Sequence, residues 1–193
     1  EKHAVMAALL MQEKQAAMRD AFREIGLPPI YTGIGINTGH MNVGDMGSSY
    51  RRAYTVLGDA VNLGSRLESI TKFYGAEILV SESTYAAVKD DFVWREVDYM
   101  QVKGKLEPIR VYEPLALPDA ANESLLRHVQ QYGLAREAYL ARRWEEAYSL
   151  FAGLAAVAED FGKLCEIYRA RIQVYRLEKL PDDWCGVWQH TEK

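Results

Sequence analysis

Apolar residues recur along the chain with two different spacings, and the change between them divides it into parts. Spacings of three and four predict an amphipathic helix over residues 1 to about 25, ended by Gly26 and Pro28-Pro29. Short apolar or alternating runs then predict strands, which lie at 30–37, 41–43, 53–57, 77–80, 93–97, 100–102 and 109–112. Because no capping residue precedes Glu1, we expect the sequence to be part of a longer chain.

A helix is predicted over residues 59–74, between two strands. Its mostly apolar stripe would bury against a sheet and consists of Ala60, Leu63, Leu67, Ile70 and Tyr74. Asp59 is expected to cap the N-terminus of this helix, and Gly75 to end it. Asn62 and Arg66 are four residues apart, so both project from one face. A carboxamide beside a guanidinium suits an anionic ligand with hydroxyl groups, such as a nucleotide, although a solvated polar face is the alternative.

Glycines indicate where backbones turn or approach one another. Gly33 and Gly35 fall within the first predicted strand and indicate close approach by another backbone or by a neighbouring subunit. Gly39-His40 is a candidate hairpin turn, and the glycine- and serine-rich segment 44–52 is expected to be a loop. With a short helix expected at 81–89, the pattern predicts an α+β fold that has a mainly antiparallel sheet and helices on one face.

The C-terminal part is predicted to be helical. After a linker at 114–121, helices are expected at 122–143, 144–160 and about 163–179. Seven residues resemble the small and large positions of one tetratricopeptide repeat: Leu134, Ala135, Ala138, Trp144, Ala147, Phe151 and Leu154. Arg142 stands where that repeat usually has a turn glycine. Two interpretations stay open: a helical unit packed on the preceding domain or a dimer mate, or a docking surface for a protein partner. The tryptophans at 184 and 188 are expected to tuck against this unit.

Composition narrows the class of protein. The net charge of −4 gives no general attraction to nucleic acid, and about half of the residues are hydrophobic, which is enough for a core. No run of about 18 apolar residues is present, so no membrane contact is expected from this sequence. Cys165 and Cys185 have no metal-ligand spacing, and no secretory signal opens the sequence. A reducing, cytoplasmic location is therefore expected, with a parent protein that upstream modules could anchor to a membrane.

Four short motifs occur in a fixed order: Gly33-Ile34-Gly35-Ile36-Asn37-Thr38-Gly39, Val43-Gly44-Asp45-Met46-Gly47, Tyr54 to Glu68, and Val102-Lys103-Gly104-Lys105. Together they resemble the second half of the class III nucleotidyl cyclase catalytic domain, the adenylate and guanylate cyclase family. The resemblance covers residues 1–117 and implies a ferredoxin-like cyclase sandwich whose first half is missing. Residues 118–193 would then form a helical extension.

The resemblance implies the roles of five residues. Asn62 would position the ribose, and Arg66 would stabilise charge at the α-phosphate while the 3′-hydroxyl attacks it. Lys103 would bind the β- and γ-phosphates, with Lys105 as the alternative residue. The alternative interpretation of this short motif is a solvated basic turn that binds no ligand. Thr55 would contact the purine, and a threonine there resembles the bacterial adenylate cyclase subgroup. The product would be cyclic AMP, released with pyrophosphate from ATP.

The metal ligands of the family have no counterpart in this sequence. The family binds two Mg²⁺ or Mn²⁺ ions through aspartates in the first half of the domain, and neither Asp20 nor Asp45 has the right context. In the family, a homodimer builds each site from two subunits. We therefore expect this sequence alone to be inactive and activity to require the upstream half. The alternatives are a guanylate cyclase and a non-catalytic, cyclase-like regulatory module.

Overall fold

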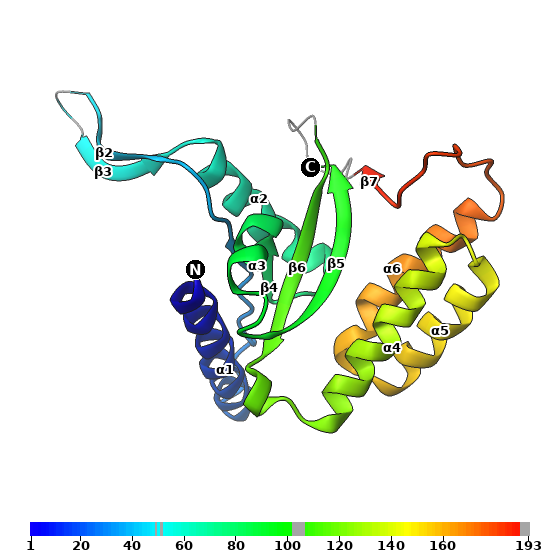
Figure 1. Ribbon diagram of the computed structural model, residues 1–193. Helices are drawn as coiled ribbons and strands as arrows, with labels where there is room; N and C mark the ends of the chain where they lie inside the picture. The colour runs from blue at the N-terminus through cyan, green and yellow to red at the C-terminus, as the bar shows by residue number, and fades with distance from the viewer. Residues whose placement is uncertain (49, 51, 102–106, 190–193) are drawn as a thin grey trace.

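The computed structural model describes residues 1–48, 50, 52–101 and 107–189 (Figure 1). Its helices and strands, in chain order, are α1 (Lys2–Glu24), β1 (Ile34–Ile36), β2 (Asn42–Gly47), β3 (Arg52–Leu57), α2 (Asp59–Tyr74), β4 (Ile78–Ser81), α3 (Glu82–Val88), β5 (Val93–Gln101), β6 (Ile109–Ala116), the 3₁₀ turn η1 (Pro118–Ala120), α4 (Glu123–Leu140), α5 (Trp144–Val157), α6 (Glu159–Tyr175) and β7 (Trp188–Gln189). The mixed α+β composition predicted from the sequence is confirmed.

The main sheet has five strands in the order β1-β4-β6-β5-β7. β6 is antiparallel to both β4 and β5, whereas β1 with β4 and β5 with β7 are parallel pairs. Along β4, Ile78 and Val80 join a core with α1 and α3, while Leu79 joins another with α2 and the C-terminal helices. Because successive strand residues point to opposite faces, helices cover both faces of the sheet. The prediction of helices on one face was wrong.

Helix α2 lies directly on strand β1, as the strand glycines predicted. A Cβ at Gly35 would lie 2.2 Å from the carbonyl oxygen of Gly64 and 2.4 Å from the amide nitrogen of Glu68. A Cβ at Gly33 would collide with the side chain of Thr71. Only glycine therefore lets the α2 backbone approach β1 this closely, which sets the height of α2 above the sheet.

Two expectations for residues 39–52 were wrong. The strand predicted at 41–43 continues to Gly47, and β2 pairs with β3 from Asn42–Leu57 to Gly47–Arg52. Gly39-His40 therefore lies before the hairpin, and residues 44–47 belong to a strand where a loop was expected. The local pattern gave the wrong prediction because pairing of the two backbones, which needs no apolar alternation, builds this exposed ribbon.

Strand β5 is continuous from Val93 to Gln101, where the pattern predicted two short strands. Its pairing with β6 shifts between Glu96 and Asp98, and such an irregularity changes which face the following residues occupy. Because of this shift, the apolar alternation breaks at residues 98–99, and the sequence pattern therefore suggested that the strand stops there. The predicted linker also begins too early, because Pro114 still belongs to β6 and pairs with Trp94 beside a second shift.

The C-terminal part contains the three predicted helices, although α5 and α6 end at Val157 and Tyr175, earlier than predicted. Asn122 caps α4 by accepting a 2.8 Å hydrogen bond from the amide of Leu125. Arg142 has a φ of 59°, the left-handed conformation for which glycine is usual. The division of the chain at residue 117, and the repeat-like character of the tail, stay predictions.

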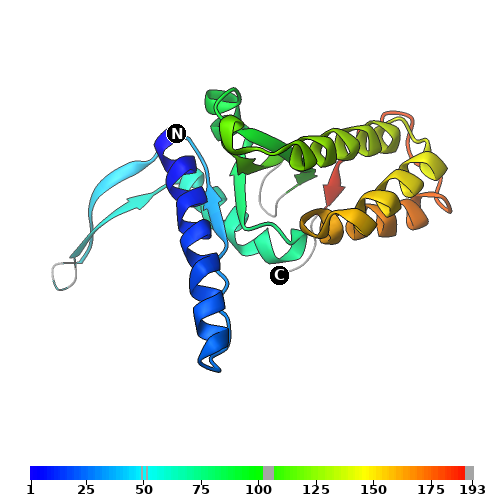
Figure 2. The same cartoon turned by 90° about the horizontal axis from the view of Figure 1, so that it is seen from below.

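The C-terminal helices pack against the sheet. One buried core contains Leu67 and Tyr74 of α2, Val97 and Met100 of β5, and side chains from all three of these helices. The β2–β3 hairpin and these helices lie at opposite ends of the molecule (Figure 2). Trp184 contacts the rings of Tyr139, Trp144 and Tyr175, as predicted, and Trp188 covers Arg171 at 4.2 Å. Packing on the preceding domain, one of the two interpretations, is thus what the structure shows.

Candidate functional site

The N-cap of helix α2 is Gly58, not Asp59 as predicted. Gly58 has the non-helical backbone that a cap requires, with a φ of 149°, and Asp59 is the first residue of the helix. A carboxylate in the first turn favours the helix through its dipole, so the correction leaves the start of α2 in place. Gly75 ends the helix in the left-handed conformation, with a φ of 67°, as predicted.

Asn62 and Arg66 occupy consecutive turns of α2. Asn62 is exposed and Arg66 is half-buried. The guanidinium nitrogen Nη1 of Arg66 is buried and has no hydrogen-bond partner among the residues that the structure describes. A buried charged donor without a partner costs free energy.

A polar network anchors the first turn of α2, and sequence reasoning missed it. The Asn37 carboxamide donates a 2.8 Å hydrogen bond to the carbonyl of Ala60 and accepts one from the hydroxyl of Ser83 at 3.2 Å. Ser83 also donates to the carbonyl of Thr38 at 2.8 Å. Asn37 belongs to one of the four motifs, which was the only signal for it in the sequence. The network fixes the loop after β1 to both α2 and α3.

Thr55 lies on β3, opposite Gly44 of β2, and is half-buried. Strand β3 runs through Gly58 directly into α2, so Thr55 and Asn62 lie on consecutive elements. The Val102–Lys105 motif falls outside the described residues, and so the expected roles of Lys103 and Lys105 stay predictions.

The described residues do not offer a donor set for the metal ions that the resemblance implies. Within 1–48, 50, 52–101 and 107–189, no group of three or more His, Cys, Asp or Glu side chains is arranged to hold an ion. We derive no step through a metal from this part of the chain.

Among the helices of the described residues, none combines the length and the hydropathy that a bilayer crossing requires.

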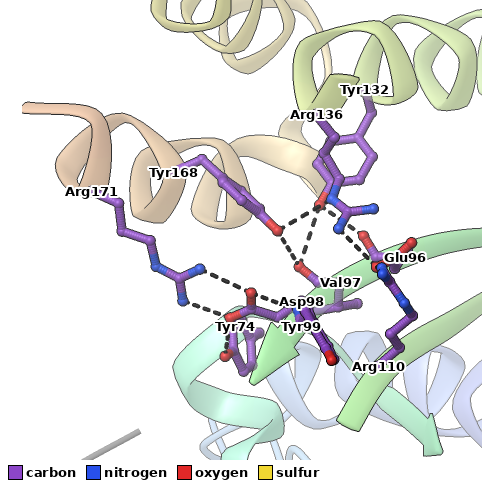
Figure 3. Close-up of polar contacts among 10 residues, drawn as sticks. All are labelled: Tyr74, Glu96, Val97, Asp98, Tyr99, Arg110, Tyr132, Arg136, Tyr168 and Arg171. Carbon is purple, nitrogen blue, oxygen red and sulfur yellow. Dashed lines mark hydrogen bonds and ion pairs between the residues drawn. The ribbon is translucent and has the colours of Figure 1, made fainter. Parts of the chain in front are cut away.

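A second polar cluster joins the C-terminal helices to strand β5 and helix α2 (Figure 3). Arg171 of α6 donates two hydrogen bonds to the Asp98 carboxylate, at 2.9 and 2.6 Å, and both side chains are almost completely buried. The Tyr74 hydroxyl of α2 donates to the same carboxylate at 2.6 Å. Burial, with the charge of Asp98, raises the pKa of Tyr74, so its hydroxyl stays protonated and donates. Asp98 therefore connects three elements.

Beside this cluster, the carboxylate of Glu96 on β5 accepts hydrogen bonds from two arginines. Arg136 of α4 donates to its carboxylate at 2.8 Å, and Arg110 of β6 donates at 2.7 Å. The Tyr132 hydroxyl donates to the Glu96 carbonyl at 2.9 Å, and the Tyr168 hydroxyl donates to the Val97 carbonyl, also at 2.9 Å. The docking of the C-terminal helices is thus polar as well as apolar.

Replacing Glu96 with Gln is expected to lower the free energy of unfolding by roughly 1–2 kcal/mol at neutral pH and by less in acid. Burial alone raises the pKa of Glu96, but the hydrogen bonds and charges of Arg136 and Arg110 outweigh it and hold this pKa below its ordinary value. A carboxyl whose pKa falls on folding stabilises the protein above its unfolded-state pKa, and this contribution disappears as pH drops through the folded-state pKa. Urea unfolding of both proteins at pH about 7 and about 3.5 measures the difference. An equal loss at both pH values would contradict this account of Glu96.

Comparison with known proteins identifies the family. The family described as the adenylate and guanylate cyclase catalytic domain matches residues 2–113. The chain therefore belongs to the adenylate and guanylate cyclase catalytic domain family. The resemblance seen in the sequence is confirmed at this level.

Individual relatives are adenylate cyclases from several organisms. The chain is 37% identical to adenylate cyclase 1 of Rhizobium meliloti (strain 1021), over 63% of this chain and 18% of that protein. It is 41% identical to an adenylate cyclase of Anabaena cylindrica, over 57% of this chain and 23% of that protein. It is 36% identical to the terminal-differentiation specific adenylate cyclase of Dictyostelium discoideum, over 77% of this chain and 7% of that protein. This last match spans 157 residues, so it is too long to fit within residues 1–117 and reaches into the C-terminal helices.

Two solved structures resemble this fold. The adenylyl cyclase CyaB from P. aeruginosa has a TM-score of 0.53 and 32% identity, over 62% of this chain and 60% of that one. The guanylyl cyclase Cya2 has a TM-score of 0.50 and 34% identity, over 62% of this chain and 59% of that one. The chain spans about a quarter or less of the length of the three sequence relatives.

Proposed function

We propose that this chain is part of a class III adenylate cyclase of the bacterial type and supplies the ribose- and phosphate-binding helix α2 to its active site. In the reaction, the ribose 3′-oxygen of ATP loses its proton and forms a bond to the α-phosphorus. The bond from the α-phosphorus to the oxygen bridging to the β-phosphorus breaks, and pyrophosphate leaves. The observation that carries the proposal is the buried Nη1 of Arg66, one turn after Asn62, which has no hydrogen-bond partner in the described part of the chain.

The assigned roles follow from the chemistry of each side chain. Arg66 would stabilise the charge that develops on the α-phosphate, because a guanidinium stays charged and presents its donors in a fixed plane. Asn62 would hold the ribose so that its 3′-oxygen is in line with the breaking bond. Thr55 would contact the purine, and Lys103, or Lys105, would bind the outer phosphates. Magnesium or manganese would supply Lewis-acid chemistry when bound, through donors from outside the described residues.

We also propose that the site is shared between two copies in a homodimer. The exposed β2–β3 hairpin supports this, because it presents Val43, Tyr50 and Tyr54 with 54%, 99% and 75% of their surface exposed. Such a set of large apolar side chains on one projecting ribbon is typical of a protein interface. The outer face of the C-terminal helices would be the docking surface for a protein partner, the second interpretation of these helices.

A guanylate cyclase is the alternative substrate class, and a guanylyl cyclase is among the structures that this chain resembles. The relatives named adenylate cyclase, together with a threonine at position 55, favour ATP. A non-catalytic, cyclase-like regulatory module is the other alternative.

The test is a cyclase assay on a longer form of the protein that includes the upstream part of the catalytic domain, with this chain alone as the control. We expect the longer form to convert ATP to cyclic AMP in the presence of Mn²⁺, and this chain alone to be inactive. Activity per molecule that rises with protein concentration would support shared sites. Faster turnover of GTP would favour the guanylate cyclase, and no cyclic product from either nucleotide would contradict an enzymatic role.

A further inference from the structure

The C-terminal end of helix α2 is held by the C-terminal helices as well as by the sheet. Tyr74, the last residue of α2, donates its hydroxyl to Asp98 at 2.6 Å, and Arg171 of α6 binds the same carboxylate through two nitrogens (Figure 3). Both members of the ion pair are buried, with side-chain exposures of 3% and 1%. A bidentate pair in such surroundings fixes direction as well as distance.

A separate contact brings α6 against the same end of α2. A Cβ at Gly75 would lie 2.7 Å from the Cβ of Lys163 and 2.8 Å from its Cγ. Lys163 and Arg171 are eight residues apart on α6, so their contacts are about 12 Å apart along that helix. Lys163 thus lies against Gly75 directly, whereas Arg171 reaches Tyr74 through the Asp98 carboxylate.

The first half of α2 carries the candidate catalytic pair. Arg66 lies eight residues before Tyr74 in one uninterrupted helix, about 12 Å along its axis. A helix this short moves as a rigid rod, so a change in its tilt at Tyr74 displaces Arg66 and Asn62. We propose that helix α6 positions α2 for catalysis, with Tyr74, Asp98 and Arg171 as positioning residues for Asn62 and Arg66. The inference rests on the proposed function for the role of that pair.

The test compares Tyr74→Phe with the matched control Tyr132→Phe. Each variant removes one hydroxyl that donates to β5, but only Tyr74 links β5 to α2. In the longer, active form, we expect Tyr74→Phe to lower kcat about tenfold with KM for ATP changed less than about twofold. Tyr132→Phe is expected to keep kcat within about twofold of the unchanged protein, because its hydroxyl bonds backbone carbonyls of β5 and makes no link to α2.

Amide hydrogen exchange on this chain separates the inference from the proposed function. We expect the amides of the second half of α2 to exchange about tenfold faster in Tyr74→Phe and at unchanged rates in Tyr132→Phe. Equal exchange of α2 in both variants, or equal loss of kcat, would overturn the positioning role. If the unchanged longer form made no cyclic nucleotide, the proposed function would fail, and the exchange experiment would still decide whether the Tyr74 hydroxyl holds α2 to the Asp98–Arg171 pair.

Discussion

Replacing Arg66 with Ala is expected to lower kcat for cyclic AMP formation by about 10²–10³-fold in the longer, active form, a loss typical of one donor to a developing oxyanion. The guanidinium contributes most when the α-phosphate gains charge, so the loss should fall on kcat more than on KM. Steady-state kinetics with ATP as the varied substrate measures both. Because Nη1 of Arg66 has no partner among the described residues, its removal breaks no known hydrogen bond there.

Arg66→Lys provides the first control, since it keeps the charge but loses the planar arrangement of donors, and we expect it to recover only part of the activity. Lys72→Ala provides the second, because it removes an exposed charge from the last turn of the same helix. We expect that variant to keep its activity. If Arg66→Ala and Lys72→Ala had the same kcat, the role assigned to Arg66 would be wrong.

Replacing Arg171 with Met is expected to lower the free energy of unfolding by about 3–5 kcal/mol. The substitution removes both hydrogen bonds from Arg171 to Asp98 and leaves a buried carboxylate that still accepts from the Tyr74 hydroxyl and the amide of Tyr99. It also removes the cation that lies over the Trp188 ring. Urea denaturation followed by circular dichroism measures the loss.

Arg143→Met serves as the matched control, because Arg143 pairs with Glu146 on the surface and both side chains are 53% exposed. Exposed pairs contribute about 0–1 kcal/mol, so little change is expected. Arg171→Lys should fall between the two variants, since a lysine keeps the charge without the bidentate geometry. Equal losses for Arg171→Met and Arg143→Met would show that the buried pair with Asp98 contributes nothing to stability.

Features with a local cause could be predicted from the sequence. The helix over 59–74 follows from its apolar spacing, and Gly75 ends it because a left-handed residue is needed there. The cap at Asn122 is also local, because its side chain bonds to an amide three residues away. The pairing of Asn62 with Arg66 on one helix face follows from helical periodicity alone. Their roles in catalysis stay predictions.

Features that depend on distant partners could not be predicted in this way. The β2–β3 hairpin lacks an apolar alternation, because an exposed ribbon is held by backbone pairing that places little demand on side chains. Helices on both faces of the sheet follow from how α1, α2 and α3 dock, which no single segment encodes. The irregularity near Asp98 depends on the register with β6, and it made one strand look like two.

The sequence by itself therefore determined the α+β class, the family and the helix that carries the candidate pair, because each depends on residues close together in the chain. Only the tertiary structure decided what Asp98 and Arg171 do. They are 73 residues apart, and in the sequence each has the pattern of an ordinary charged residue. Folding removes both from water and places them against Tyr74, where a buried charge must have a partner. The sequence did not reveal this burial. In the folded protein, the buried pair of Asp98 and Arg171 joins the sheet, helix α2 and the C-terminal helices.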